Sequence, residues 1–419
     1  MTLYCLAVFS LGTLTLSAAA GGPSTAAQAV NALGLDLLAK GTEPGANALL
    51  SPYSIQSALA MTFAGAAGET RAEMARVLHY PGDEAELHRS FAALQQALEE
   101  IHKSTALRAE QSRQRGGPSD PVTLTVANRL FGQRSYAFRE AFLALMKDTY
   151  GAPFQPMDFA GNPSQARLQI NGWVEEQTRQ RIRDLIPPDG LNRETRLVLV
   201  NSIYLKAPWM EEFQARATKP LPFYVKGGEP KEVPTMYRQG MPGYSKREGF
   251  SVVTLPYSGG DLQFLILLPE AKDGLPALAA KLTPEVLAAC ANPGRAELQL
   301  YLPKLKMEPP LFKLGKVLRS LGMLTAFDEP QGSANFDRMA PRKPDEYLYI
   351  SEVFHKTFLA LDEKGTEAAA ATAVAMMRAT AILEKPKPIE VHVDHPFLFA
   401  IQHRPSGACL FLGRVTDPR

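Results

Sequence analysis

The sequence predicts an α+β fold, because helical and strand patterns occupy different parts of the chain. Between residues 52 and 101, apolar side chains recur at helical spacing among strong helix formers. From residue 197 onward, apolar segments with strand-like patterns prevail. Helices that precede several long strands are typical of α+β proteins with more than one sheet.

The helical part opens at a Ser-Pro step, where Pro52 is placed to start a helix.

The polar segment Lys103–Pro121 ends in Gly-Gly-Pro and has little to bury, so we expect it to be a solvated connector. Its alternative role is a basic patch for a polyanion, formed by Arg108, Arg113 and Arg115. We expect helices at residues 54–67, 69–78, 84–101, 138–150, 162–184 and 310–321.

The strand part consists of apolar segments with β-forming composition. Leu197–Trp209 is long and mostly apolar, which predicts a buried strand. The chain ends with two further apolar strands, His395–His403 and Ala408–Val415. Other strands are expected at residues 122–132, 251–257, 261–269, 297–307 and 347–363.

The composition is that of an ordinary soluble globular protein, with 45% hydrophobic and 21% charged residues in a chain of 419. The formal net charge is +2, which gives no reason to expect nucleic acid or a membrane as partner. At the N-terminus, the apolar run Leu3–Leu16 precedes the small residues Ser17–Gly22. We therefore expect residues 1–22 to be a signal peptide and the protein to be secreted or periplasmic. A buried N-terminal segment is the alternative.

The three cysteines do not make a disulfide framework. Cys5 would leave with the signal peptide. Cys290 and Cys409 could pair, but Cys409 lies in an apolar run and is expected to be a buried thiol. The high Ala and Pro content and the sparse cysteines favour a bacterial source.

No constellation of residues indicates catalysis. None of the seven histidines lies in an HExxH pattern, and no CxxC motif, GxSxG elbow, P-loop or dinucleotide fingerprint is present. His392 and His395 flank a strand edge and are a weak candidate for a metal pair. We therefore expect neither an enzyme nor a metal or other cofactor.

The segment Glu363–Ala375 has an unusual composition, EKGTEAAAATAVA. An Ala-rich helix is one interpretation. The other interpretation is an extended strand, in which alternate residues face opposite sides of a sheet. Every side chain from Thr366 to Ala375 except Glu367 is small or β-branched, and none is proline. Such a segment can slide into a sheet as an added strand, since no side chain obstructs it and every N–H can join the ladder. It can also stay outside as an exposed loop.

This segment resembles the hinge of the reactive loop of inhibitory serpins, and the resemblance extends over nearly all of residues 25–419. Four further motifs support the resemblance. NALLSPYSIQSALAMTFAGAAGET (Asn47–Thr70) resembles the start of the family's helix B, and NGWVEEQTRQRIRDLI (Asn171–Ile186) resembles its helix F region. LVNSIYLKAPWMEEF (Leu199–Phe213) resembles the third strand of the main sheet, and DHPFLFAIQHRPSGACLFLGRVTDP (Asp394–Pro418) resembles the C-terminal signature. Separate motifs in the family's order make the resemblance specific.

The serpin resemblance implies a fold of three β-sheets and eight or nine helices. It implies one domain over residues 23–419, with an exposed reactive-centre loop near residues 363–388. The implied function is a suicide-substrate inhibitor of serine or cysteine proteases, acting as a monomer. The partner protease would form a covalent acyl-enzyme on the loop and be trapped when the cut loop inserts into the main sheet. A non-inhibitory serpin that acts as a binding protein, carrier or chaperone is the alternative.

The matched motifs also imply roles for single residues. Ser51, Ser54, Asn201 and His355 match the polar cluster called the shutter, under the middle of the main sheet. Trp209 matches the breach, where the loop first inserts. The hinge positions are Glu363, Gly365, Thr366, Glu367, Ala368, Ala369, Ala370, Ala371 and Thr372.

The bond that is cut follows from counting along the loop. Inhibitory serpins usually place the scissile residue sixteen positions after the hinge glutamate, which gives Ala379 and the bond Ala379–Thr380. That residue would suit elastase-like proteases, whose small pocket accepts Ala. A hinge shorter by one residue would make Arg378 the scissile residue and a trypsin-like protease the target. Met377 is a third candidate.

Overall fold

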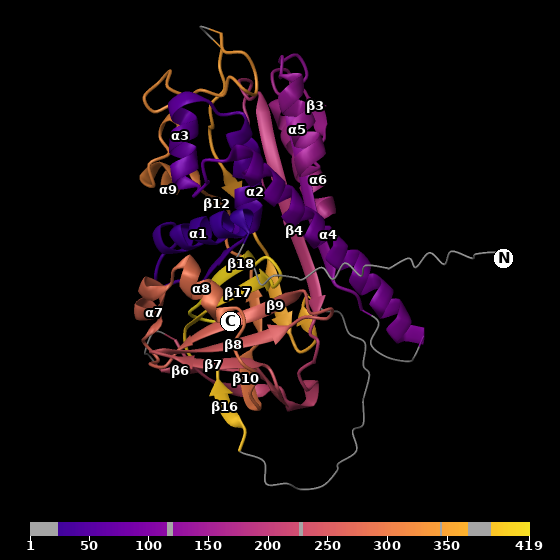
Figure 1. Ribbon diagram of the computed structural model, residues 1–419, viewed down its shortest axis with the longest axis vertical. Helices are drawn as coiled ribbons and strands as arrows, with labels where there is room; N and C mark the ends of the chain where they lie inside the picture. The colour runs from indigo at the N-terminus through magenta and orange to yellow at the C-terminus, as the bar shows by residue number, and fades with distance from the viewer. Residues whose placement is uncertain (1–23, 115–119, 226–228, 344–345, 368–386) are drawn as a thin grey trace, which may run out of the picture.

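The computed structural model describes residues 24–114, 120–225, 229–343, 346–367 and 387–419. The expected signal peptide, the hinge beyond Glu367 and the reactive bond lie outside these ranges. Figure 1 shows α2, α3, α5 and α6 towards one end of the molecule, many of the later strands towards the other, and β4 running between the two. The nine α-helices of the described ranges are α1 (Thr25–Lys40), α2 (Pro52–Ala64), α3 (Gly68–Val77), α4 (Glu84–Gln114), α5 (Glu140–Tyr150), α6 (Pro163–Gln177), α7 (Leu275–Lys281), α8 (Pro284–Cys290) and α9 (Gly315–Ser320).

The main sheet has the longest strands and positions the candidate site. Its central pair, β2 and β4, is antiparallel, from Thr123 opposite Lys206 to Gly132 opposite Leu197. A two-residue strand, β15, lies between β4 and β14. The order across the sheet is β11 (Leu305–Met307), β14 (Leu359–Asp362), β15 (Gly365–Thr366), β4 (Leu197–Pro208), β2 (Thr123–Gln133) and β3 (Phe154–Met157).

Two further sheets and a short ribbon complete the strands. One sheet has the order β1 (Ala48–Leu50), β18 (Ala408–Val415), β17 (Phe397–His403), β9 (Leu262–Pro269), β8 (Phe250–Pro256) and β7 (Gly243–Arg247). The other has the order β16 (Ile389–His392), β10 (Leu298–Pro303), β6 (Pro230–Gly240) and β5 (Lys219–Tyr224). The ribbon pairs β12 (Phe312–Lys313) with β13 (Phe354–His355). The prediction of an α+β fold with three sheets and eight or nine helices is confirmed.

Helix α2 lies behind the main sheet and shows how the local sequence makes a buried helix. Ser51 caps it, with its hydroxyl accepting the N–H of Ser54, and Pro52 occupies the first turn. Nearly every residue of the helix is buried, so its apolar side chains face all round rather than along one stripe. The predicted strands at the C-terminus are confirmed too, because every residue of β17 and β18 is buried.

The connector predicted at residues 103–121 is wrong for residues 103–114, because α4 continues to Gln114. Thr105 and Ala109 are buried, so this part of the chain has more to bury than its polarity indicated. An ion pair between Lys103 and Glu100, 2.7 Å apart, supports the helix at the usual spacing of three residues.

Three other predicted elements are shorter than expected. The helix predicted at residues 162–184 ends at Gln177, and Arg179 and Gln180 then adopt left-handed backbone angles. The helix predicted at residues 310–321 is reduced to α9. Within residues 347–363, the strands are β13 and β14, because much of the remaining segment borders a cavity instead of a partner strand.

Cys290 and Cys409 are free and buried, so the predicted buried thiol is confirmed and the alternative disulfide is wrong. Burial raises the pKa of the Cys409 thiol to about 12, although a hydrogen bond from Gln402 opposes the shift. No helix in the described ranges is both long and apolar enough to cross a membrane.

Candidate functional site

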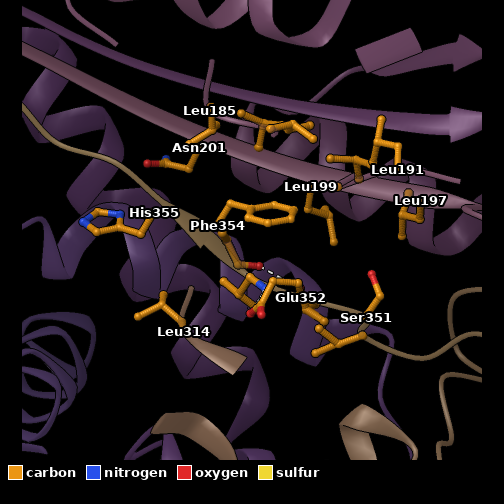
Figure 2. A pocket seen from close by; sticks show the side chains of 18 of the residues that line it. Leu185, Leu191, Leu197, Leu199, Asn201, Leu314, Ser351, Glu352, Phe354 and His355 are labelled. Atoms are coloured by element: carbon orange, nitrogen blue, oxygen red, sulfur yellow. Dashed lines mark hydrogen bonds between the residues drawn. The ribbon is translucent and has the colours of Figure 1, made fainter. Parts of the chain in front are cut away.

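A cavity of about 390 Å³ lies between β4 and residues 347–356, and we call it the slot. Figure 2 shows Leu197, Leu199 and Asn201 of β4 on one side and Phe354 with His355 on the other. Residues of α2 line it, as do residues of the segment that follows α6. The slot therefore separates β4 of the main sheet from the segment that precedes β14, another strand of that sheet.

The edge of β4 that faces the slot is free over most of its length. On that side β4 pairs with β15 at Ala207 and Pro208, and from Leu197 to Lys206 it has no ladder partner among the described residues. At about 3.3 Å per residue, this free edge is roughly 30 Å long. Its backbone N–H and C=O groups are a template for one more strand.

The hinge begins in the sheet at one end of this free edge. Gly365 lies opposite Pro208, and Thr366 lies opposite Ala207, in antiparallel register. A Cβ at position 365 would lie 2.1 Å from the carbonyl oxygen of Ala207, so only glycine fits there. Thr366 is 1% exposed, and its hydroxyl lies 2.6 Å from the hydroxyl of Tyr257. Gly365 and Thr366 of the hinge are thus already part of the main sheet.

Trp209 holds this end of the sheet together. Its backbone N–H donates to the carbonyl of Lys364 at 2.8 Å, and its indole N–H donates to the carbonyl of Asp362 at 3.0 Å. Its ring stacks on Tyr257, with centroids 4.6 Å apart and an interplanar angle of 6°. The residue predicted for the breach therefore bonds the end of β14 and the turn that leads from β14 into β15.

Glu363 is anchored at the base of the hinge. Its carboxylate accepts hydrogen bonds from Thr218 at 2.7 Å and from Lys304 at 2.9 Å, and its carbonyl accepts the N–H of Phe213 at 2.8 Å. Burial opposes ionisation, but the bonds from Lys304 and Thr218 outweigh it and hold the pKa of Glu363 below its usual value. The chain that leads into the hinge is therefore fixed by charge as well as by strand pairing.

The four residues predicted for the shutter lie together beside the slot. The N–H of Ser51 donates to Nε2 of His355 at 3.1 Å, and the hydroxyl of Ser54 donates to the carbonyl of Asn201 at 3.3 Å. Burial lowers the pKa of His355 to about 4, so the imidazole is neutral at pH 7 and can accept this bond. The Nδ2 of Asn201 donates to the Oδ1 of Asn128 on β2 at 2.5 Å.

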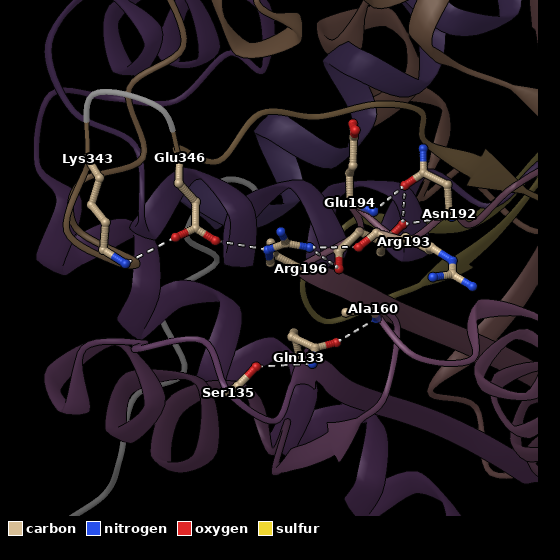
Figure 3. A network of polar contacts seen from close by, with 10 residues as sticks. Gln133, Ser135, Ala160, Asn192, Arg193, Glu194, Arg196, Lys343 and Glu346 are labelled. Atoms are coloured by element: carbon tan, nitrogen blue, oxygen red, sulfur yellow. Dashed lines mark hydrogen bonds and ion pairs between the residues drawn. The ribbon is translucent and has the colours of Figure 1, made fainter.

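Charged residues form a network near the end of the slot opposite the hinge (Figure 3). Arg196 comes just before β4, and its Nε donates to the carboxylate of Glu346 at 3.2 Å. Glu346 also pairs with Lys343 at 3.0 Å, and the hydrogen bonds from Lys343 and Arg196 lower its pKa. This ion pair joins the two walls of the slot at one end, as β15 joins them at the other.

Sequence reasoning did not identify several residues of this site. Tyr257, Thr218 and Lys304 contact the hinge, and Asn128 contacts the shutter, yet each is far from its partner in the sequence. No motif spacing connects them, because the contacts arise from sheet topology. Among the positions predicted for the hinge, the structure describes Glu363, Gly365, Thr366 and Glu367. Ala368–Thr372 and the candidates Met377, Arg378, Ala379 and Thr380 lie outside the described residues.

Comparison with known proteins gives consistent matches. The family model described as "Serpin (serine protease inhibitor)" matches residues 28–418. The leukocyte elastase inhibitor of Bos taurus is 39% identical over 384 residues, which cover 90% of this chain and 94% of that protein. Antithrombin-III of Mus musculus is 34% identical over 375 residues, covering 89% of this chain and 76% of that protein.

Solved structures match as well. The structure titled "Cleaved Serpin 42Da" has a TM-score of 0.78 and 29% identity, covering 94% of this chain and 98% of that one. Uncleaved ovalbumin has a TM-score of 0.75 and 28% identity, covering 94% of this chain and 100% of that one. The likeness therefore includes one structure with a cut chain and one with an intact chain.

Proposed function

The chain belongs to the serpin family, and from this membership we propose that it is a suicide-substrate inhibitor that traps serine proteases by inserting its cut loop into the slot. The observation that carries the proposal is the free edge of β4, with the hinge already in register at one end of it. The relatives named above as an elastase inhibitor and as antithrombin support the same function.

In the proposed reaction, the serine hydroxyl of the protease adds to the carbonyl carbon of Ala379. The bond between Ala379 and the nitrogen of Thr380 then breaks, and the new amino group of Thr380 takes up the proton. Ala379 remains attached to the protease as an ester. The freed end of the loop can now follow Thr366 into the slot and carry the protease along the sheet, so that deacylation fails.

The side chains of the loop suit the slot. Because side chains alternate along a strand and Thr366 faces the interior, Ala368, Ala370, Thr372 and Val374 would follow it inward. These are small or β-branched residues, which pack well in a central strand. Each new residue would pair its backbone with the free edge of β4, and this pairing makes insertion favourable.

We propose Ala379–Thr380 as the reactive bond and an elastase-like protease as the target. The count from Glu363 supports it, as does the name of the relative that inhibits leukocyte elastase. Cleavage at Arg378 by a trypsin-like protease is the rival. Mass spectrometry of the C-terminal fragment released from a complex distinguishes the two, because the fragment begins at Thr380 in one case and at Ala379 in the other.

The proposal is tested by incubating the full chain with pancreatic elastase and with trypsin. An inhibitor gives a complex that survives boiling in detergent, whereas a non-inhibitory serpin is only cut. A second measurement uses a metalloprotease, which cuts the loop without forming an acyl-enzyme. The melting temperature Tm of the cut protein should rise far above that of the intact one. An unchanged Tm together with no stable complex would contradict the proposal.

We further propose that the inhibitor is exported and acts as a monomer. The apolar run Leu3–Leu16, followed by the small residues Ser17–Gly22, supports export. The mass of the protein recovered outside the cytoplasm tests cleavage near residue 22. Light scattering of the purified protein tests the monomer.

A further inference from the structure

Glu367 directly follows Thr366, the last residue of β15. Its φ is 52°, in the left-handed region that non-glycine residues rarely adopt. Its N–H donates to the carbonyl of Ala360 on β14 at 2.8 Å. An extended Glu367 would continue β15 and lie opposite Lys206, the next residue of the free edge. The strand β15 therefore ends at a left-handed residue, whose backbone conformation must change before the strand can grow.

The side chain of Glu367 is held while its backbone is in this conformation. Its carboxylate forms an ion pair with the guanidinium of Arg181, and the side chain is 10% exposed. Tyr204 on β4 also hydrogen-bonds the carboxylate. Burial raises the pKa of Tyr204, and the charge of Glu367 raises it further. Two different elements thus contact this carboxylate.

Arg181 belongs to a segment that crosses the slot, residues 178–186, which we call the bridge. On one wall, the guanidinium of Arg179 lies over the ring of Tyr204, 5.3 Å from its centroid. On the other wall, the guanidinium of Arg181 lies over the ring of Phe358 at 5.0 Å, and Lys356 donates to the carbonyl of Arg183 at 2.9 Å. The bridge therefore contacts both walls and reaches the hinge through Arg181.

The bridge is itself strained. Arg179, Gln180 and Asp184 have φ values of 49°, 64° and 48°, all in the left-handed region. Ile182 and Leu185 are buried and line the slot. A strained segment that lines the slot and pairs with Glu367 has the parts of a releasable stop.

We propose that Arg181 is a positioning residue that holds the hinge at Thr366 and sets how fast the rest of the loop inserts. The effect on the rate of insertion rests on the proposed function, but the contact between Arg181 and Glu367 can be tested without a protease. To extend the strand, Glu367 must become extended and leave the position in which it pairs with Arg181. Loss of the pair weakens the held state, so insertion becomes faster relative to hydrolysis of the acyl-enzyme.

The first experiment measures hydrogen exchange in the intact protein. In Arg181→Ala, the amides of Thr366 and Glu367 should exchange about tenfold faster, the effect expected on losing a hydrogen bond to a charged group. Arg181→Lys should restore most of the protection. Arg183→Ala is the matched control, because the Arg183 side chain is exposed and donates to its own segment at Gln180. Equal exchange in Arg181→Ala and wild type would overturn the proposal.

The second experiment measures the limiting rate at which a detergent-resistant complex forms at saturating elastase, by quenched flow. Arg181→Ala and Glu367→Gln should each raise this rate about tenfold, and the double variant should be no faster than either, because both remove one shared contact. A lower or unchanged rate in Arg181→Ala contradicts the positioning role. If the wild type forms no complex, the proposed function fails, and the exchange comparison still decides whether Arg181 holds the hinge.

Discussion

The hydroxyl of Tyr257 lies 2.6 Å from the hydroxyl of Thr366, in a fully buried contact between β15 and the residue that follows β8. The ring of Tyr257 also stacks on Trp209, which bonds Asp362 of β14 and Lys364 of the turn before β15. This contact joins the inserted end of the loop to the body of the protein. Its strength therefore bears on both the stability of the intact protein and the register of insertion.

Replacing Tyr257 by Phe removes this contact while keeping the stacked ring. The free energy of unfolding of the intact protein should fall by about 1–2 kcal/mol, because the hydroxyl of Thr366 stays buried without a partner. Urea denaturation followed by circular dichroism measures the change. Tyr244→Phe is a suitable control on a neighbouring strand, and a loss of the same size there would show that the contact with Thr366 is not responsible.

Replacing Thr366 by Arg should turn the inhibitor into a substrate. Thr366 is 1% exposed and faces Tyr257, so a long charged side chain cannot occupy this position without being buried unpaired. Elastase should then cut the loop at a normal rate and be released, which a gel shows as cut chain without complex. Thr366→Ser keeps the hydroxyl and should still trap. Efficient trapping by Thr366→Arg would mean that this position does not insert.

Changing Ala379 to Arg should transfer inhibition from elastase to trypsin. Elastase pockets accept small side chains, whereas an acidic pocket selects Arg. The rate of elastase inhibition should fall by at least about tenfold, since the preferred side chain is lost. The C-terminal fragment released by trypsin from the variant should begin at Thr380. If elastase inhibition is unaffected, Ala379 is not the scissile residue, and Met377→Ala is the next variant to measure.

The buried imidazole of His355 predicts a loss of stability in mild acid. Burial lowers its pKa to about 4 in the folded protein from 6.5 in the unfolded chain. The unfolded chain therefore binds more protons between these values, so stability is full above pH 6.5 and falls as the pH drops towards 4. The free energy of unfolding should fall by about 1.4 kcal/mol for each pH unit in this range for one such histidine.

The measurement is the free energy of unfolding from pH 4.5 to 7 for wild type and His355→Asn. His403 contributes a similar slope, because burial lowers its pKa to about 4 as well, with Asp261 opposing the shift. His355→Asn and His403→Asn should each lower the slope by about 1.4 kcal/mol per pH unit, and the slope that remains includes His88, whose pKa is also lowered by burial. An unchanged slope in His355→Asn would show that its imidazole is protonated in the folded protein or does not titrate in this range.

Much of the framework could be predicted from local pattern. The Ser-Pro start of α2, the apolar strand β4 and the two C-terminal strands each carry their own signal over a few residues. The length of α4 was missed because polar side chains on a half-exposed helix resemble those of a connector. Local composition cannot separate these two cases.

The contacts of the site were predictable in part. The shutter and hinge positions lie within motifs, so their neighbourhood followed from the serpin resemblance. Tyr257 and Thr366 are 109 residues apart, and Arg181 and Glu367 are 186 apart, so no spacing rule connects them. The slot could not be predicted from the sequence either, because it is a gap between β4 and residues 347–356 rather than a property of either segment.

The burial of Cys290 and Cys409 has a practical consequence for watching the loop move. Thiolates are the species that react with maleimide dyes, and burial raises the pKa of both thiols, so neither should take up a dye at neutral pH. In the mature chain that the proposed export would produce, which lacks Cys5, a cysteine placed at Ala373 can carry a fluorophore without any other residue being replaced. Energy transfer from this dye to a second label on the protease would then report its travel in real time.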